Sequence, residues 1–274
     1  MRVADGSLVA GFNAGKVTGE VRDLALVRNR LWIAGAFTHV GSRAQKALAT
    51  IDPATGAPTR HMALPLAGQH HGGTTQVLAI DATAAGDRLA LVGNFRTVGG
   101  AARRQLAVLD IGASTAKVAT FRTNFYADTC SGKNTTYLRD VAFEPGGSWF
   151  VAVTTGGVGG PGRPCDTAAR FETQAGATVP TWLARTGGDT MTAVTVARGA
   201  VYVGGHFRWL NNPYGANRPA PGAVPRSGIA ALDPFNGLPL PWDPGRTRGW
   251  GCSTCWPPTR ACGSAPTPIG STGS

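Results

Sequence analysis

Short apolar segments separated by turn residues alternate along most of this chain, and one pattern of them recurs. An apolar run ends in a small residue, Gly, any residue and Phe in three segments: Trp32–Phe37, Ala90–Phe95 and Tyr202–Phe207. A second apolar run then ends in an acid at Asp52, Asp110, Glu172 and Asp233. An aromatic residue follows about ten positions later, at Phe121, Trp182 and Trp242, with Phe12 as the remnant of an earlier copy. Runs this short, with alternating or continuous apolar residues, indicate β-strands.

The spacing of the repeat indicates the fold class. The four acids lie about 60 residues apart, which is typical of propeller blades built of short strands rather than of a helical solenoid. We therefore predict an all-β propeller of four-stranded blades, incomplete, with about four and a half blades present. The expected domain covers 1–251, and its blade units are 1–15 as a remnant, 18–72, 76–127, 137–186 and 190–245.

Composition and charge limit the kinds of partner that we expect for this chain. The 274-residue chain has a formal net charge of +11, which is compatible with an anionic partner. The basic residues are nearly all arginines and are scattered, as GC-rich codons produce, so we expect no nucleic-acid surface. No apolar run is long enough to span a membrane, and the start lacks the apolar stretch of a signal peptide. No motif for a cofactor is present.

The recurring motifs resemble the delta-60-repeat β-propellers of secreted proteins from high-GC bacteria. The resemblance covers about residues 1–250 and rests on the small-Gly-x-Phe strand endings together with these segments: Asp52–Gly56, Cys165–Arg170, Val201–Tyr214 and Leu240–Gly245. It implies an extracellular or envelope-attached module, and it implies no established catalytic residues. A non-catalytic binding or scaffold function is therefore expected, with polysaccharide or another envelope protein as the partner.

The repeated acids have a structural interpretation. Asp52, Asp110 and Glu172 fall where strands pass into turns, and an acid there can accept hydrogen bonds from turn amides. A calcium site would need several oxygens that converge on one point, and equivalent positions on different blades lie apart. The histidines show no metal-ligand spacing either, and we expect His70-His71 to be an exposed loop pair. No metal site is predicted.

Two charged pairs on the inner strands are candidates for an axial site. Arg22-Asp23 and Arg139-Asp140 lie on the strands nearest the propeller axis. Two carboxylates there could act as acid and base on a sugar, as in an extracellular hydrolase or lyase. The structural alternative is that each Arg–Asp pair satisfies itself inside the channel. A cluster of carboxylates with perturbed pKa values would favour the enzyme over the scaffold.

A long insertion after Phe207 is the best binding candidate. It carries four residues of interest: Trp209, Asn211, Asn212 and Tyr214. Aromatic faces stack on the CH faces of sugar rings, and side-chain amides bind hydroxyl groups, so these residue types suit a carbohydrate. The alternative is that Trp209 and Tyr214 only hold the loop in place.

The cysteines divide into two groups. Cys130 and Cys165 lie in loops of the third unit that could meet at one end of a blade, so we predict a disulfide between them and an oxidising compartment. The other three of the five cysteines lie within 252–274, a segment without acids or a strand pattern. Shifted by one base, that segment can encode the strands of a further blade, so we expect an out-of-frame read there, with a disordered tail as the alternative and no metal on its cysteines.

Both ends of the expected propeller fall within a blade. Its terminal strand edges would then be unpaired, and such edges promote association with other chains. We predict that the chain does not close a ring and that the isolated chain is poorly soluble or forms oligomers.

Overall fold

The structure is a computed structural model, and it describes residues 4–130, 133–158, 162–174, 176, 178–197 and 199–245. The segment 252–274, which we expect to be out of frame, lies outside the described residues. The described residues form strands and turns and no helix, as the all-β prediction requires. None of them therefore forms a helix that could cross a membrane.

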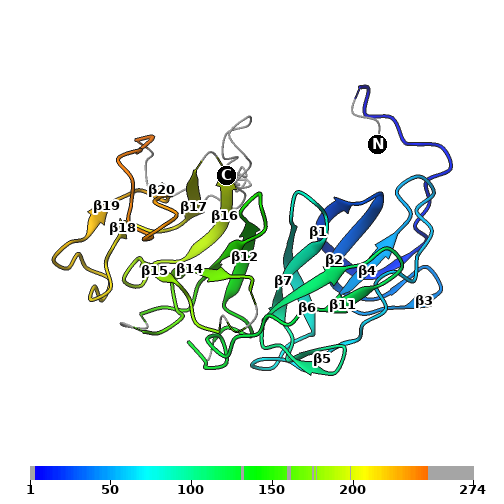
Figure 1. The fold of residues 1–274 in the computed structure, drawn as a ribbon, viewed down its shortest axis with the longest axis horizontal. Coiled ribbons are helices and arrows are strands. Elements are labelled where there is room, and N and C mark those ends of the chain that lie inside the picture. Colours follow the sequence, from blue (N-terminus) through cyan, green and yellow to red (C-terminus); the bar gives the residue numbers. More distant parts are fainter. Residues whose placement is uncertain are drawn as a thin grey trace, which may run out of the picture.

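Four antiparallel sheets, numbered here in chain order, contain most of the strands (Figure 1). Sheet 1 contains β1 (Val17–Val27), β2 (Arg30–Val40), β3 (Arg43–Ala44) and β4 (Leu48–Ile51). Sheet 2 contains β6 (Gln76–Ala82), β7 (Arg88–Asn94), β10 (Leu106–Ile111) and β11 (Ala116–Val118). Sheet 3 contains β12 (Leu138–Phe143), β13 (Trp149–Thr154), β14 (Thr167–Glu172) and β15 (Trp182–Arg185). Sheet 4 contains β16 (Met191–Ala197), β17 (Ala200–Gly205) and β20 (Ile229–Leu232).

Each sheet is a meander in which a strand pairs with the next main strand of the same sheet along the chain, and the short hairpin strands are not counted in this order. By this count the third strands are β4, β10, β14 and β20. Sheets 2 and 3 have four strands in this order. In sheets 1 and 4 the outermost strand is reduced to a single bridge, Ile51 with Pro58 and Leu232 with Pro239. Short hairpins extend the loops after the second strands, in the pairs β2 with β3, β8 (Thr97–Val98) with β9 (Ala101–Ala102), and β18 (Trp209–Leu210) with β19 (Val224–Pro225). β5 (Leu66–Ala67) pairs with β8.

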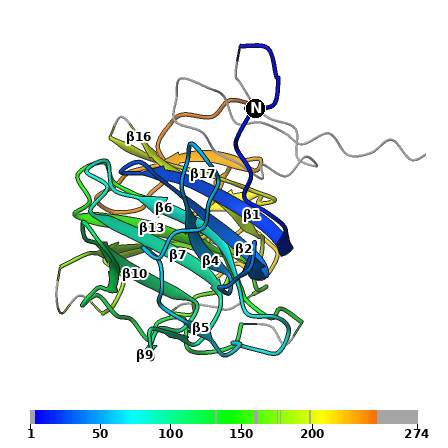
Figure 2. The same ribbon diagram turned by 90° about the vertical axis from the view of Figure 1, so that its right-hand side faces the viewer.

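The sheets pack face to face in chain order, and their first strands lie next to one another (Figures 1 and 2). β6 contacts β1 and β12, and β12 contacts β16. One apolar core fills each gap between neighbouring sheets. Representative members are Trp32 and Leu109 between sheets 1 and 2, Val108 and Phe150 between sheets 2 and 3, and Val151 and Val203 between sheets 3 and 4. Burial of these faces between sheets is the main source of stability.

The glycine of the repeated strand ending is required because a larger residue would clash with the neighbouring strand. Gly35, Gly93 and Gly205 each pair with the first strand at its bulge. A Cβ added at these positions would lie 2.0, 2.2 and 2.3 Å from a carbonyl oxygen, of the first strand at Gly35 and Gly93 and of Thr190, just before the first strand, at Gly205. The phenylalanine two residues later is buried in all three sheets. In sheet 3, Thr154 takes the glycine's place in the pairing and donates its hydroxyl to the carbonyl of Pro164 at 2.7 Å.

A second regularity was not expected from the sequence. The residue just before the third strand of each sheet has a positive φ: Ala47 at 65°, Gln105 at 66°, Asp166 at 50° and Gly228 at 78°. Three of these four are not glycine, although positive φ is uncommon for residues with a side chain. The backbone geometry of this position is therefore kept in every sheet while its side chain changes.

Sheets 1 and 4 stand at the two ends of the stack, to the right and left in Figure 1. No strand of sheet 1 pairs with a strand of sheet 4 among the described residues. Apolar side chains remain exposed on both end faces, with Leu24 58% and Leu26 68% exposed on β1 and Trp242 44% exposed after sheet 4. The segment 4–15 forms no strand among its described residues, but the N–H of Asn13 donates to the carbonyl of Thr55 at 2.7 Å.

Candidate functional site

Carboxylates of the first strands join each sheet to the next. Asp23 Oδ2 on β1 accepts the N–H of Ile80 on β6 at 2.7 Å. Asp81 Oδ2 on β6 accepts the N–H of Phe143 on β12 at 2.7 Å. Asp140 Oδ2 on β12 accepts the N–H of Val194 on β16 at 2.8 Å. We call these three residues the axial carboxylates. Each forms the same kind of hydrogen bond, and each points from one sheet to the following sheet.

The axial carboxylates have raised pKa values. Burial is the largest cause in each, and it outweighs the backbone N–H groups that favour the ionised form. The pKa of Asp23 is raised, that of Asp81 is raised to about 6, and that of Asp140 to about 7. Asp23 also raises the pKa of Asp81, and Asp23 and Asp81 together raise that of Asp140. The three groups therefore sense one another as a cluster.

The two predicted axial pairs, Arg22-Asp23 and Arg139-Asp140, do not have the arrangement in which the arginine of each pair binds its neighbouring aspartate. Arg22 forms an ion pair with Glu20 at 2.8 Å, and Asp23 accepts backbone N–H groups instead. Asp140 likewise accepts the N–H groups of Val194 and Val141. Burial lowers the pKa of the Arg139 guanidinium. The carboxylates are thus held by backbone amides of the next sheet.

Sequence reasoning missed Asp81. In the second unit, the segment Gln76-Val77-Leu78 corresponds in sequence to Val21-Arg22-Asp23 and contains no acid. Asp81 lies two pairing positions beyond the bulge of β6, whereas Asp23 and Asp140 lie directly after theirs. An acid within the apolar run Ala79–Ala82 was the available signal.

The insertion that follows Phe207 folds around its own amide side chains. Asn212 is fully buried and donates to the carbonyls of Thr186 and Arg218, both at 3.0 Å. Its Oδ1 accepts the N–H of Ala220 at 3.0 Å. Asn211 has a positive φ of 49° and donates to the carbonyl of Gly222 at 2.9 Å. Both amides therefore organise the loop.

The two aromatics of the insertion differ in exposure. The guanidinium of Arg208 lies over the ring of Trp209, 4.4 Å from its centroid, and Asp189 fixes that guanidinium through an ion pair at 2.8 Å. One face of Trp209 is thus covered by a cation. Tyr214 is 75% exposed. Tyr214 is therefore the residue of the predicted set that presents the largest free surface.

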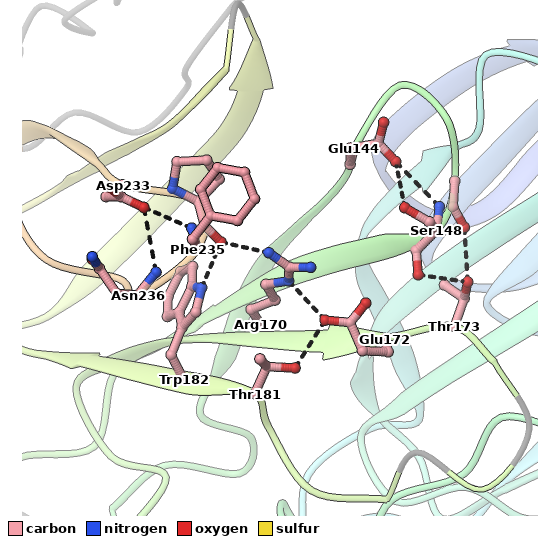
Figure 3. Close-up of polar contacts among 12 residues, drawn as sticks. Glu144, Ser148, Arg170, Glu172, Thr173, Thr181, Trp182, Asp233, Phe235 and Asn236 are labelled. Carbon is pink, nitrogen blue, oxygen red and sulfur yellow. Dashed lines mark hydrogen bonds and ion pairs between the residues drawn. The ribbon is translucent and has the colours of Figure 1, made fainter.

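Figure 3 shows how an acid turn of sheet 4 docks on the outer strands of sheet 3. Asp233 Oδ1 accepts the N–H groups of Phe235 and Asn236, and this closes the turn. The carbonyl of Pro234 accepts hydrogen bonds from Trp182 Nε1 at 2.8 Å and from Arg170 at 2.6 Å. Arg170 also pairs with Glu172 at 2.9 Å. The turn therefore joins two sheets at their outer edges.

The structural interpretation of the repeated acids holds for some of them. Asp52 Oδ1 accepts the N–H groups of Ala54 and Thr55, as predicted for a turn acid. The interpretation is wrong for the other two acids. Glu172 pairs with Arg170 and accepts the hydroxyl of Thr181, and Asp110 lies within β10, 3.7 Å from Arg88. Glu172 thus faces a cation on its own strand β14, and Asp110 faces one on the paired strand β7, instead of turn amides.

Two further expectations have clear outcomes. Cys130 and Cys165 form a disulfide with a Cα–Cα distance of 5.5 Å, which confirms the predicted pairing. A disulfide is compatible with an extracellular location. The expectation of an exposed His70-His71 pair is wrong for His70, which is buried edge-on against Tyr137 with a centroid distance of 5.3 Å. Within the described residues no group of three or more His, Cys, Asp or Glu could hold a metal ion.

Comparison with protein-family models and with curated proteins gives no match. Similar solved structures include the Dos1 propeller, with 8% identity over 82% of this chain and 44% of that chain, and a TM-score of 0.45. Another is the Myceliophteria thermophila Cps50 (Swd1) β-propeller domain, with 10% identity over 67% of this chain and 49% of that chain, and a TM-score of 0.39. The chain thus spans less than half the length of either structure. The successive face-packed meanders of this chain themselves define a propeller type of fold.

Proposed function

We propose that this chain is a non-catalytic, secreted or cell-surface β-propeller module that binds polysaccharide, with about four and a half blades of the delta-60-repeat kind. The observation that carries the proposal is the occupation of the axial carboxylates: each one already accepts a backbone N–H from the next sheet. These hydrogen bonds hold neighbouring sheets together, so the side chains that remain available to bind a ligand lie in the loops. In such folds a rigid scaffold supports binding loops.

The insertion provides the binding surface in this proposal. Its backbone is fixed from within by Asn212 and Asn211, so that little order would be lost on binding. Tyr214 presents an exposed aromatic ring with a hydroxyl, and a sugar ring can stack on it. The Cys130–Cys165 disulfide supports an oxidising, extracellular setting.

Affinity electrophoresis through gels that contain single soluble polysaccharides tests the proposal. The wild-type chain should be retarded by at least one neutral or acidic polysaccharide, and Tyr214→Ala should lose most of the retardation. Phe235→Ala is the matched control, because Phe235 is 81% exposed on the Asp233 turn, outside the insertion. Equal retardation of Tyr214→Ala and the wild type, or no retardation in any gel, would refute the proposed binding surface.

The alternative is an extracellular hydrolase or lyase that acts at the propeller axis. The specific observation in its favour is the mutual coupling of the axial carboxylates, with pKa values of about 6 for Asp81 and about 7 for Asp140. A carboxyl group that titrates near neutrality can act as a general acid or base. Release of reducing ends or of unsaturated sugars by the wild type, lost in Asp140→Asn and in Asp81→Asn, would support the enzyme. A wild type that releases neither product would exclude it for the polysaccharides assayed.

A further inference from the structure

A groove is lined by loops of sheets 2 and 3 next to their outermost strands, β11 and β15. Its volume is about 750 Å³, and a neighbouring hollow of about 520 Å³ shares Arg103, Arg122 and Thr178 with it. Ala101 and Ala102 of β9 line one side. The segment that follows β11 and the residues that precede β15 line the rest. This size is in the usual range for sites that hold small ligands or a few sugar units.

The two walls of the groove are joined by a side-chain hydroxyl. Thr123 is buried and donates its hydroxyl to the carbonyl of Thr178 at 2.6 Å. The same hydroxyl accepts the N–H of Phe125 at 3.0 Å. The segment from sheet 2 and the loop of sheet 3 are therefore held together beneath the groove, and the lining is preformed rather than assembled by a ligand.

Arg103 is fixed in the groove and retains hydrogen-bonding capacity. Its guanidinium donates to the carbonyls of Ala102 and Ala119, both at 2.8 Å. Its Nε is buried and has no hydrogen-bond partner among the described residues. Burial, and secondarily the charge of Arg122, lower the pKa of Arg103. A partly buried cation with no acid among the described residues that line the groove is an unfavourable arrangement that a bound anion would relieve.

Arg122 is the second cation of the groove, and it is exposed. The structure shows no hydrogen bond or ion pair from the Arg122 side chain to the described residues. No acid is among the described residues that line the two hollows. Two guanidinium groups without a carboxylate are a suitable receptor for an oxyanion, which a guanidinium can bind through two parallel hydrogen bonds.

The rest of the lining suits a sugar ring. The amide of Asn124 can bind hydroxyl groups, and Phe125 and Val179 provide apolar surface. We propose that this groove binds an acidic polysaccharide and that Arg103 and Arg122 hold the carboxylate or sulfate group of one sugar unit. This inference rests on the proposed polysaccharide-binding function and adds a second binding surface to it.

The test compares two arginine variants in the same gels. Affinity electrophoresis is run with polygalacturonate, which carries carboxylates, with its methyl ester, which has the same backbone without the charge, with dextran sulfate and with neutral dextran. Arg122→Gln removes a groove cation at an exposed position, so the fold should be preserved. Arg104→Gln is the matched control, because it removes the same charge from an exposed neighbour of Arg103 outside the groove lining.

We expect Arg122→Gln to weaken the apparent affinity for one of the two polyanions at least about tenfold, since a lost charge-assisted hydrogen bond has about that effect. Arg104→Gln should weaken it less than about twofold, as expected for a screened surface charge. The polyanion that shows the difference identifies the bound group as carboxylate or sulfate. Equal losses in both variants would mean non-specific attraction by the net charge of +11 and would overturn the inference.

A further comparison separates this inference from the proposed function. If Tyr214→Ala loses most of the retardation while Arg122→Gln is retarded as strongly as the wild type, polysaccharide binding stands and the groove is rejected as its site. If the wild type is not retarded by any of the four polysaccharides, both are rejected for these polymers.

Discussion

We expect the Asp140→Asn variant to be more stable than the wild type at neutral pH and slightly less stable than the wild type in acid. Asp140 lies on β12, its pKa is raised to about 7, and its carboxylate accepts the N–H of Val194 on β16. The amide side chain of the variant would keep a carbonyl oxygen for that hydrogen bond and would remove the charge that burial disfavours. The replacement is therefore informative because it separates the hydrogen bond from the ionisation.

The magnitude follows from the difference in pKa between the folded and unfolded states. A shift from 3.8 to about 7 is roughly three units, which corresponds to about 4 kcal/mol. Between these two values the folded state holds more protons than the unfolded state, so the wild type loses this stability as the pH rises from about 4 to about 7. Below about pH 4 the penalty is absent, and above about pH 7 it is complete. The stability of the Asp140→Asn variant minus that of the wild type should therefore rise by up to about 4 kcal/mol over this window.

Urea unfolding followed by tryptophan fluorescence, at several pH values between about 4 and 8, measures this difference. At about pH 4 the variant should be about 1 kcal/mol less stable, because one carboxyl oxygen is replaced by an amide NH₂ that faces the N–H of Val141. At about pH 8 the order should reverse. Asp110→Asn is the control, since it removes an exposed charge from β10 and should give nearly parallel curves. Parallel curves for Asp140→Asn as well would refute the assignment of a buried, neutral-range carboxyl group.

Three other outcomes are expected. Cys130→Ser should lower the free energy of unfolding by about 3–4 kcal/mol, because the disulfide closes a loop with a sequence separation of 35, and reduction of the wild type should lower its free energy of unfolding, measured by urea titration, by a similar amount. Gly93→Ala should lower the melting temperature more than Gly72→Ala, because a Cβ at Gly93 would lie 2.2 Å from a strand carbonyl, whereas at Gly72 no atom lies within 4 Å and the cost is the strain of its φ of 66° alone, about 1 kcal/mol; similar losses would argue against a steric role for Gly93. The isolated wild type should form oligomers through its exposed end faces, and Trp242→Lys should shift light-scattering masses toward the monomer; a wild type that is already a monomer would contradict this.

The sequence was sufficient for the all-β class, because apolar runs between turn residues are local signals. Tertiary contacts explain what it could not reveal. Trp242 was predicted as a closing aromatic, and it packs edge-on against Tyr202 at 5.4 Å. In sheet 1, His61 packs edge-on against Trp32 in the same manner at 5.7 Å, although no aromatic was identified there. A pattern search for aromatics does not recognise an imidazole that fills the same space.

The candidate site was less predictable for a related reason. The sequence identified Asp23 and Asp140 as inner-strand acids but not their acceptor role, because each one binds a sheet that lies more than 50 positions further along the chain. It identified the insertion but not the roles of its amides, which depend on which loop carbonyls come near. The Arg103–Arg122 groove was invisible because its two cations are 19 positions apart and meet only through the folding of two loops.

The residue with positive φ before the third strand of each meander (Ala47, Gln105, Asp166 or Gly228) allows the contacts between neighbouring sheets to diversify independently. The gap between two neighbouring sheets is called a seam here, numbered in chain order. At this position the main chain makes the turn, and the side chain is left free for a different task in each repeat. Gln105 uses it to bind the carbonyl of Tyr126 and the hydroxyl of Thr136 in the second seam, while Ala47 fills apolar space in the first. Gly228 leaves the position empty in sheet 4. A repeat protein with such a position can acquire a new internal contact by a single substitution, without a change in strand register and without disturbing its other repeats.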